Sequence, residues 1–130
     1  MTKDTSINAG AFIREILSAD GTVNTITTRI FPISVDEATL PYISYRRTRM
    51  QQQPNKFGMP GADTVEVEVN CFTQTYAESV ELAEAVRAAL DGKQCTLDGG
   101  LEMRSCYLTD GSEDWQDDAF VQQMIFTIRI

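Results

Sequence analysis

The fold is decided by one stretch, residues 63–90, which reads DTVEVEVNCFTQTYAESVELAEAVRAAL. Its first half alternates apolar and polar side chains, with Val65, Val67, Val69 and Cys71 on one side and Glu66, Glu68 and Asn70 on the other. A repeat of two residues is typical of a strand that buries one face and exposes the other. We therefore predict a strand whose valine face belongs to the core.

A helix is predicted to follow this strand directly. Thr75 and Glu78 have the Thr-x-x-Glu spacing of a capping box, in which each side chain bonds the other residue's backbone N–H. Wound at 3.6 residues per turn, one side of the helix collects Tyr76, Val80, Ala83, Val86 and Leu90, with Leu82 and Ala89 at its margin. Gly92 ends the helix, because glycine tolerates the left-handed C′ conformation. The apolar side should cover the valine face.

The remaining pattern predicts an α+β domain. Residues 6–19 form an amphipathic helix, and residues 22–28 are interpreted as loop or irregular structure. Further strands are expected at residues 29–32, 41–50, 94–97, 101–108 and 119–130, the fourth with Leu101, Met103 and Tyr107 on one face, and residues 110–118 form an acidic loop. We expect a mainly antiparallel sheet of four or five strands, with both helices packed on one face.

A long extended β-arm interrupts this plan. Residues 51–62, QQQPNKFGMPGA, contain two prolines, two glycines and no periodicity, yet they also include Phe57 and Met59. A structureless loop of this length is uncommon inside a compact domain and is usually functional or disordered. Together with its flanking strands, this loop is predicted to form the arm.

Composition places the chain among folded globular proteins. With 130 residues, 42% of them hydrophobic, it is long enough to bury roughly two thirds of its unfolded surface in one domain. It has no apolar run near the roughly 18 residues of a membrane span, and MTKDTSINAG lacks the core of a signal peptide. We therefore expect no membrane partner. Cys71, Cys95 and Cys106 match no zinc or redox spacing and are interpreted as reduced, mostly buried thiols.

The charges are unevenly distributed along the chain. A formal net charge of −8 with no histidine argues against tight nucleic-acid binding, which depends on cations that replace counterions at phosphates. Between Glu37 and Asp63, however, every charged residue is basic, namely Arg46, Arg47, Arg49 and Lys56. The acids gather later, at Asp110, Glu113, Asp114, Asp117 and Asp118. We expect an electrically two-sided molecule.

Few residues indicate catalysis. The chain lacks histidine, the commonest general acid–base residue, and it has no Gly-x-Ser-x-Gly, phosphate-binding glycine loop or Cys-x-x-Cys motif. Glu66 and Glu68 could form a carboxylate pair, but acids on the outward face of a strand are more often solvated or face another subunit. Asp114, Asp117 and Asp118 lack the spacing and turn glycine of a calcium loop. We predict no enzyme, cofactor or metal site.

Contact residues are predicted on the arm, the second helix and the acidic loop. The arm arginines either discourage edge-to-edge aggregation of an exposed strand or, beside apolar side chains, form a protein–protein contact. Arg87 either lies over the sheet edge or reaches a partner chain. Trp115 anchors the acidic loop either to its own core or to a neighbour. The predicted contact residues are Arg46, Arg47, Arg49, Lys56, Phe57, Met59, Arg87, Asp114, Trp115 and Asp117.

Three blocks, taken together, resemble a known family. They are RIFP at residues 29–32, LPYISY at residues 40–45, and the strand-to-helix stretch that ends YAESVELAEAVRAAL. In this order and spacing they resemble the small tail-completion proteins of long-tailed phages and prophages, which are similar in fold to the lambda-type tail terminator. The resemblance spans nearly the whole chain. It departs at Gly21-Thr22, where relatives often have proline, and in the arginine-rich arm.

The resemblance implies a structural protein of the virion tail or neck, assembled in the host bacterial cytoplasm, with one tail-terminator-like domain over residues 1–130. Such a subunit forms a hexameric ring that caps the tail tube, offers a docking surface to the DNA-filled head, and lets DNA pass without specific binding. The expected partners are further copies of the chain, the tail-tube protein and the head connector protein. The family has no catalytic residues, and the free protein is expected to be a monomer until its template is present.

Two alternatives remain at this point. One is a head-closure connector protein, which has the same location but contacts the portal side. The other is a small cytoplasmic α+β dimer that binds a ligand or acts as an enzyme. A deep apolar pocket with convergent polar groups would favour the dimer. A flat-sided subunit with a protruding arm would favour the virion protein.

Overall fold

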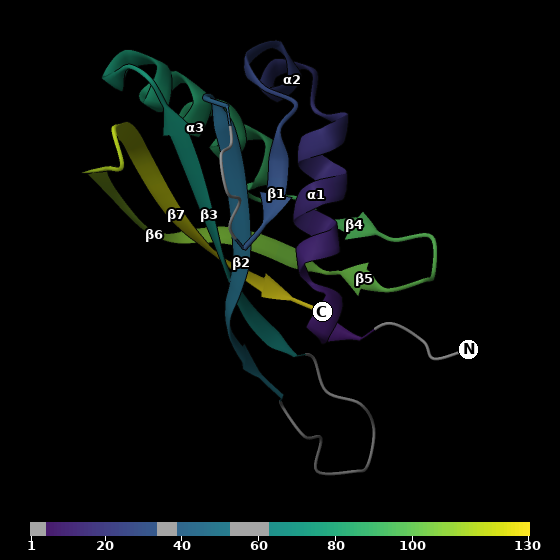
Figure 1. Cartoon of the computed structure of the whole chain (residues 1–130). Coiled ribbons are helices and arrows are strands. Elements are labelled where there is room, and N and C mark those ends of the chain that lie inside the picture. Colours follow the sequence, from purple (N-terminus) through teal and green to yellow (C-terminus); the bar gives the residue numbers. More distant parts are fainter. Residues whose placement is uncertain (1–4, 34–38, 53–62) are drawn as a thin grey trace, which may run out of the picture.

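The computed structural model describes residues 5–33, 39–52 and 63–130 of the chain (Figure 1). The helical elements are the 3-10 turn η1 (Ser6–Asn8), α1 (Gly10–Ala19), α2 (Gly21–Ile26) and α3 (Tyr76–Leu90). The strands are β1 (Ile30–Pro32), β2 (Tyr42–Gln51), β3 (Thr64–Thr73), β4 (Cys95–Thr96), β5 (Glu102–Met103), β6 (Ser105–Gln116) and β7 (Ala119–Arg129). Five strands form one sheet in the order β1-β2-β3-β7-β6, and β4 pairs separately with β5.

The α+β prediction is confirmed, with two corrections. The sheet is mixed, because β1 runs parallel to β2 while the other neighbouring pairs are antiparallel. The described residues contain three α-helices. The additional helix, α2, lies largely in the stretch of residues 22–28 for which the sequence predicts a loop. The Asp20 side chain caps α2 by accepting a hydrogen bond from the Val23 N–H at 2.9 Å. A helix of six residues is too short to display a 3.6-residue repeat, so the pattern did not reveal it.

The sheet has one buried face and one open face, as the alternation in β3 predicts. Val65, Val67, Val69 and Cys71 of β3 are fully buried, and α1 and α3 pack on this helix-covered side of the sheet (Figure 1). In the register of the sheet, Val67 lies beside Phe126 of β7, which is also fully buried. The open face carries the glutamates of β3. In the described residues, no helix is long and apolar enough to cross a membrane.

Helix α3 begins and ends as predicted but is rotated about its axis. The Thr75 hydroxyl accepts a hydrogen bond from the Glu78 N–H at 3.2 Å, and Gly92 has a left-handed φ of 77°. Tyr76 and Val80, which we expected in the core, are exposed, whereas Ser79 is fully buried. Ser79 is satisfied there because its hydroxyl donates to the Tyr76 carbonyl at 2.7 Å and accepts from the Gln122 side chain at 3.3 Å. The reciprocal half of the capping box is missing, since the buried Glu78 Oε1 has no partner.

The C-terminal half differs most from the prediction. Met103 and Tyr107 do not share a face, because the chain leaves β5 at Arg104 before β6 begins; Met103 is buried and Tyr107 is exposed. The supposed acidic loop is largely strand. β6 continues through Gln116, which pairs with Ala119 of β7, and only Asp117 and Asp118 form the turn. The three cysteines are free, and burial raises the pKa of the Cys71 and Cys106 thiols to about 12.

Candidate interaction surfaces

The basic end of the molecule is the distal half of β2. β1 pairs with β2 only as far as Tyr45, so the outer edge of β2 from Arg46 onward has no partner strand among the described residues. Every residue from there to Gln51 is exposed. A register shift between Arg47 and Arg49 interrupts the pairing with β3. Arginines and a bulge on a free edge both discourage unwanted strand pairing, so the aggregation-blocking interpretation fits this edge.

The three arginines of this end have different environments. Arg46 lies on the open face and forms an ion pair with Glu68 at 2.8 Å. Arg47 lies on the helix side and donates a hydrogen bond to the carbonyl oxygen of Ile7 at 2.8 Å. Arg49 makes no hydrogen bond or ion pair with any described residue, so its guanidinium is free to bind a partner. Lys56, Phe57 and Met59 of the predicted arm tip lie outside the described residues.

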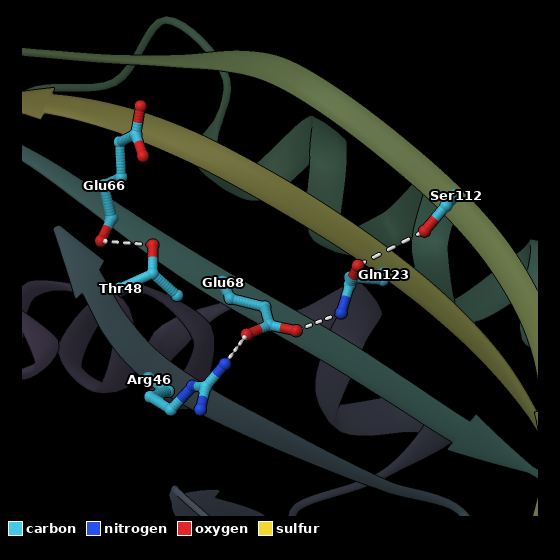
Figure 2. Close-up of polar contacts among 6 residues, drawn as sticks. All are labelled: Arg46, Thr48, Glu66, Glu68, Ser112 and Gln123. Carbon is cyan, nitrogen blue, oxygen red and sulfur yellow. Dashed lines mark hydrogen bonds and ion pairs between the residues drawn. The ribbon is translucent and has the colours of Figure 1, made fainter.

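Glu66 and Glu68 do not converge on a site. Figure 2 shows that the Glu68 carboxylate lies between Arg46 and Gln123, whereas the Glu66 carboxylate points away from this group. Gln123 in turn accepts a hydrogen bond from the Ser112 hydroxyl at 3.2 Å, so the polar chain crosses four strands. Glu68 is only 8% exposed, contrary to the solvated surface that we predicted, because side chains of both neighbouring strands cover it. Its partners make it a structural group on the open face.

The acidic end of the molecule is the β6–β7 hairpin. Trp115 is 52% exposed, and its ring makes a T-shaped contact with the ring of Phe120 at a centroid distance of 4.7 Å. Phe120 also contacts the ring of Tyr76 from the start of α3, at 5.9 Å. Trp115 therefore packs on its own hairpin, as the first of its two predicted roles requires. About half of its surface remains exposed and is available to a neighbour, as the second requires. These aromatic rings, with Glu113 and Gln122, line a hollow of about 250 Å³.

A hydrogen-bonded carboxylate ties this hairpin to α3. Glu113 accepts hydrogen bonds from the Gln122 amide and the Tyr76 hydroxyl, each at 2.9 Å. These two bonds lower the pKa of Glu113, and the bond to Glu113 raises the pKa of Tyr76. Both shifts stabilise the same pair of protonation states, a charged Glu113 and a neutral Tyr76, at neutral pH. The hairpin is thus held against the start of α3 by a contact that the sequence did not predict.

The hairpin turn is built from residues that are strained there. Asp117 and Asp118 have φ values of 51° and 61°, the left-handed region that a two-residue hairpin turn requires and that glycine usually supplies. Burial, and secondarily the charge of Asp117, raises the pKa of Tyr42 on β2. Aspartate is tolerated at such turn positions, but glycine adopts them at a lower steric cost.

Asp118→Gly is expected to stabilise the protein by about 0.5–1 kcal/mol, a rise in Tm of about 2–4 °C, because glycine adopts positive φ without steric cost. Thermal unfolding followed by circular dichroism measures this. Asp114→Gly is the matched control, because it removes the same charge from an extended position in β6. Glycine weakens a strand, so the control should lower Tm. A fall in both variants would contradict the assigned turn.

Comparison with known proteins identifies the family. The family model described as "Tail completion protein gp17" matches residues 11–130. The chain belongs to that family. It is also similar to a chain in a solved structure described as "Virion of native gene transfer agent (GTA) particle", at 18% identity over 90% of each chain and a TM-score of 0.75. That likeness shows the fold. None of the curated proteins matches.

This tail completion protein is therefore a structural protein of the phage tail and belongs to no enzyme family, as the absence of catalytic motifs predicted. Arg87 of α3 is a predicted contact residue outside the two charged ends. Because α3 is rotated, Arg87 lies on its exposed side and approaches Asp91 one turn away, with 3.9 Å between Nε and Oδ2. It also lines a hollow with Leu108 and Ser112 of the edge strand β6, which places it over the sheet edge, the first of its two predicted positions.

One concave surface of this tail completion protein was not predicted from the sequence, although two of its arginines were predicted contact residues. A hollow of about 440 Å³ lies between the start of α1, the end of β1 and the middle of β2. We call it the β1-edge hollow and define it by Ile7, Arg14, Pro32, Ile33, Tyr45 and Arg47. Arg46 also lines it, and of its lining residues only Arg46 and Arg47 were among the predicted contact residues. The others come together through the parallel pairing of β1 with β2, for which no local sequence pattern exists.

Proposed function

We propose that this tail completion protein is the subunit of a hexameric ring that caps the tail tube and forms the surface to which the head docks. Family membership supports the location in the tail. The observation that carries the ring is the separation of two chemically opposite surfaces. The arginines of β2 and the acids of the β6–β7 hairpin lie at different ends and on different edges of one sheet (Figure 1). A head-to-tail interface requires two different, complementary patches on each subunit.

The charge of the whole chain agrees with passage of DNA through such a ring. At a formal net charge of −8, the subunit as a whole gains nothing from release of phosphate counterions, so DNA slides without being held. In this proposal one domain over residues 1–130 folds in the host cytoplasm and stays monomeric until a tail tube is present. Its partners are its own copies, the tail-tube protein and the head connector protein.

A head-closure connector remains the second candidate, since its ring would satisfy the same charge pattern. The two candidates differ in the partner, and wild-type protein mixed separately with purified tail tubes and purified portal complexes separates them. Rings on the tube ends, seen by electron microscopy, support tail completion. Rings on the portal alone support a head-closure connector. A stable dimer that binds neither tail tubes nor portal supports the small cytoplasmic dimer.

Charge reversal at the free edge of β2 tests the ring interface. Arg47→Glu with Arg49→Glu should reduce the ring population on tail tubes by about tenfold or more, because like charges then meet across the interface. The Tm should change by less than about 2 °C, because neither arginine forms an ion pair with a described residue. Native mass spectrometry over a concentration series, with and without tail tubes, gives the oligomer populations.

The matched control is Lys93→Glu with Arg104→Glu, which makes the same change of charge at two exposed residues of neither surface. This control pair should assemble as the wild type does. Equal assembly by the arginine variant and the wild type would argue that the β2 arginines serve only to protect a strand edge.

A further inference from the structure

The β1-edge hollow has the composition of a contact site. Its apolar residues Ile7 and Ile33 keep 65% and 67% of their surface exposed to solvent, and Tyr45 forms part of its wall. Arg14 and Arg47 add positive charge to the same hollow. Exposed apolar side chains gathered around a concavity and bordered by charge mark interaction sites on proteins. The chemistry fits a partner that is apolar at its tip and negatively charged around it.

Backbone strain adds an independent observation. Ile33 has a φ of 63°, a genuine outlier for a β-branched residue. Its N–H donates to the Tyr45 carbonyl at 2.7 Å, which fixes this conformation while the side chain remains exposed in the hollow. Strained residues of this kind concentrate where a ligand or a partner is bound. Nothing in the described core uses the Ile33 side chain.

The hairpin of the same chain has the complementary chemistry. Trp115 presents half of its surface at the tip, and carboxylates surround it at Glu113, Asp114, Asp117 and Asp118. Tryptophan is enriched among the residues that dominate binding energy, and it requires a concave, largely apolar receptor. A volume of about 440 Å³ lies within the range of ligand-binding clefts on proteins. The positive charge of the hollow and the negative charge of the tip favour the same orientation.

The topology of the sheet prevents the contact from forming within one chain. β1 and β6 are the two edge strands, and β2, β3 and β7 separate them. In Figure 1 the hairpin tip lies on the far side of β3 from β1 and α1. A hairpin that cannot reach its own hollow can reach the hollow of a neighbour, and repetition of that contact from copy to copy is heterologous and can close a ring.

We propose that the β6–β7 hairpin of one copy inserts Trp115 into the β1-edge hollow of the next copy, with Asp114 and Asp117 facing Arg14 and Arg47. This contact rests on the proposed ring and names the two surfaces that meet in it. A buried tryptophan covers about 150–250 Å², well below the roughly 800 Å² per partner of a standard interface. One contact alone is therefore weak, which agrees with a monomer that assembles only on a template.

Two complementary charge variants test the contact in trans. The hollow-reversed variant carries Arg14→Glu and Arg47→Glu. The tip-reversed variant carries Asp114→Lys, Gln116→Lys, Asp117→Asn and Asp118→Asn, so that two introduced lysines outweigh Glu113, the one carboxylate left at the tip. Asparagine is tolerated in the left-handed turn. Each variant alone should lose about a hundredfold in ring occupancy on purified tail tubes, because like charges meet at every interface. An equal mixture should recover to within about tenfold of the wild type. In the mixture each acidic tip meets a basic hollow and each basic tip meets an acidic hollow, which yields an alternating ring.

Electron microscopy of tube ends gives the occupancy, and native mass spectrometry of the released rings gives the 1:1 composition. Ile33→Asn provides a second, independent measurement, because asparagine relieves the strain at positive φ. Its Tm should stay level or rise while ring occupancy falls by about tenfold. This combination is not expected of a residue that only supports the monomer.

Assembly of both charge variants at the wild-type level, no recovery in the mixture, or wild-type assembly by Ile33→Asn would each overturn the contact while leaving the ring in place. The control pair Lys93→Glu and Arg104→Glu should assemble normally in the same experiment. Wild-type protein that stays monomeric on tail tubes contradicts the proposed function itself and removes the contact with it. The two failures are therefore distinguishable from the wild-type sample alone.

Discussion

Trp115→Ala is expected to weaken ring assembly on tail tubes by about a hundredfold, which corresponds to about 3 kcal/mol per interface. The variant removes the apolar group that enters the β1-edge hollow of the next copy and leaves that hollow exposed to water. The monomer should lose only about 0.5–1.5 kcal/mol, because the indole makes one T-shaped contact with Phe120 and is half exposed. Titration of protein onto tail tubes, with rings counted by electron microscopy, measures the loss of ring assembly. Thermal unfolding measures the loss in free energy of unfolding of the monomer.

Tyr107→Ala is the matched control for this prediction. Tyr107 is an aromatic residue of the same strand, β6, and at 57% it is slightly more exposed than Trp115, but it lies far from the hairpin turn. Its loss should leave assembly within about threefold of the wild type, the range of an ordinary surface substitution. A similar loss in both variants would show that assembly responds to aromatic content of the strand rather than to the hairpin tip.

The elements that the sequence predicted correctly are those with a long, regular repeat. The valines of β3 alternate with polar residues over the whole strand, and all of them are buried as expected. The cap at Thr75 and the stop at Gly92 are local signals, and both are present in the structure. These features depend on neighbours within a few residues along the chain, so the chain itself is sufficient to indicate them.

The incorrect predictions concern elements whose structure depends on residues far away in the sequence. The rotation of α3 depends on Gln122 of β7, which satisfies buried Ser79 and so lets a polar side chain displace Tyr76 from the core. The acidic stretch was interpreted as loop because aspartate and glycine are rare in strands. The stretch forms a strand because it pairs with β7, whose sequence strongly favours a strand. Its turn contains no glycine, so the usual sequence signal of a hairpin turn is missing.

The candidate surfaces follow the same division. The arginines of the arm could be placed on an exposed strand from their pattern alone, and they are exposed. The β1-edge hollow could not be predicted, because Ile7, Ile33 and Tyr45 come from three separate elements that meet only in the folded chain. Exposed isoleucines in a sequence look the same as buried ones, and only their place in the fold distinguishes them.

Phe126→Ala is expected to destabilise the protein by about 3–5 kcal/mol, the cost of removing a buried aromatic ring and leaving a cavity. Phe126 is fully buried and lies between Val67 of β3 and Leu108 of β6 in the register of the sheet. The loss is a large part of a typical total of about 5–15 kcal/mol and should lower Tm by about 12–20 °C. Ile125→Ala, one residue away on the open face, should cost only about 1–2 kcal/mol. A slip of one residue in the pairing of β7 would exchange the two faces and reverse this order, so chemical denaturation of the two variants tests the register directly.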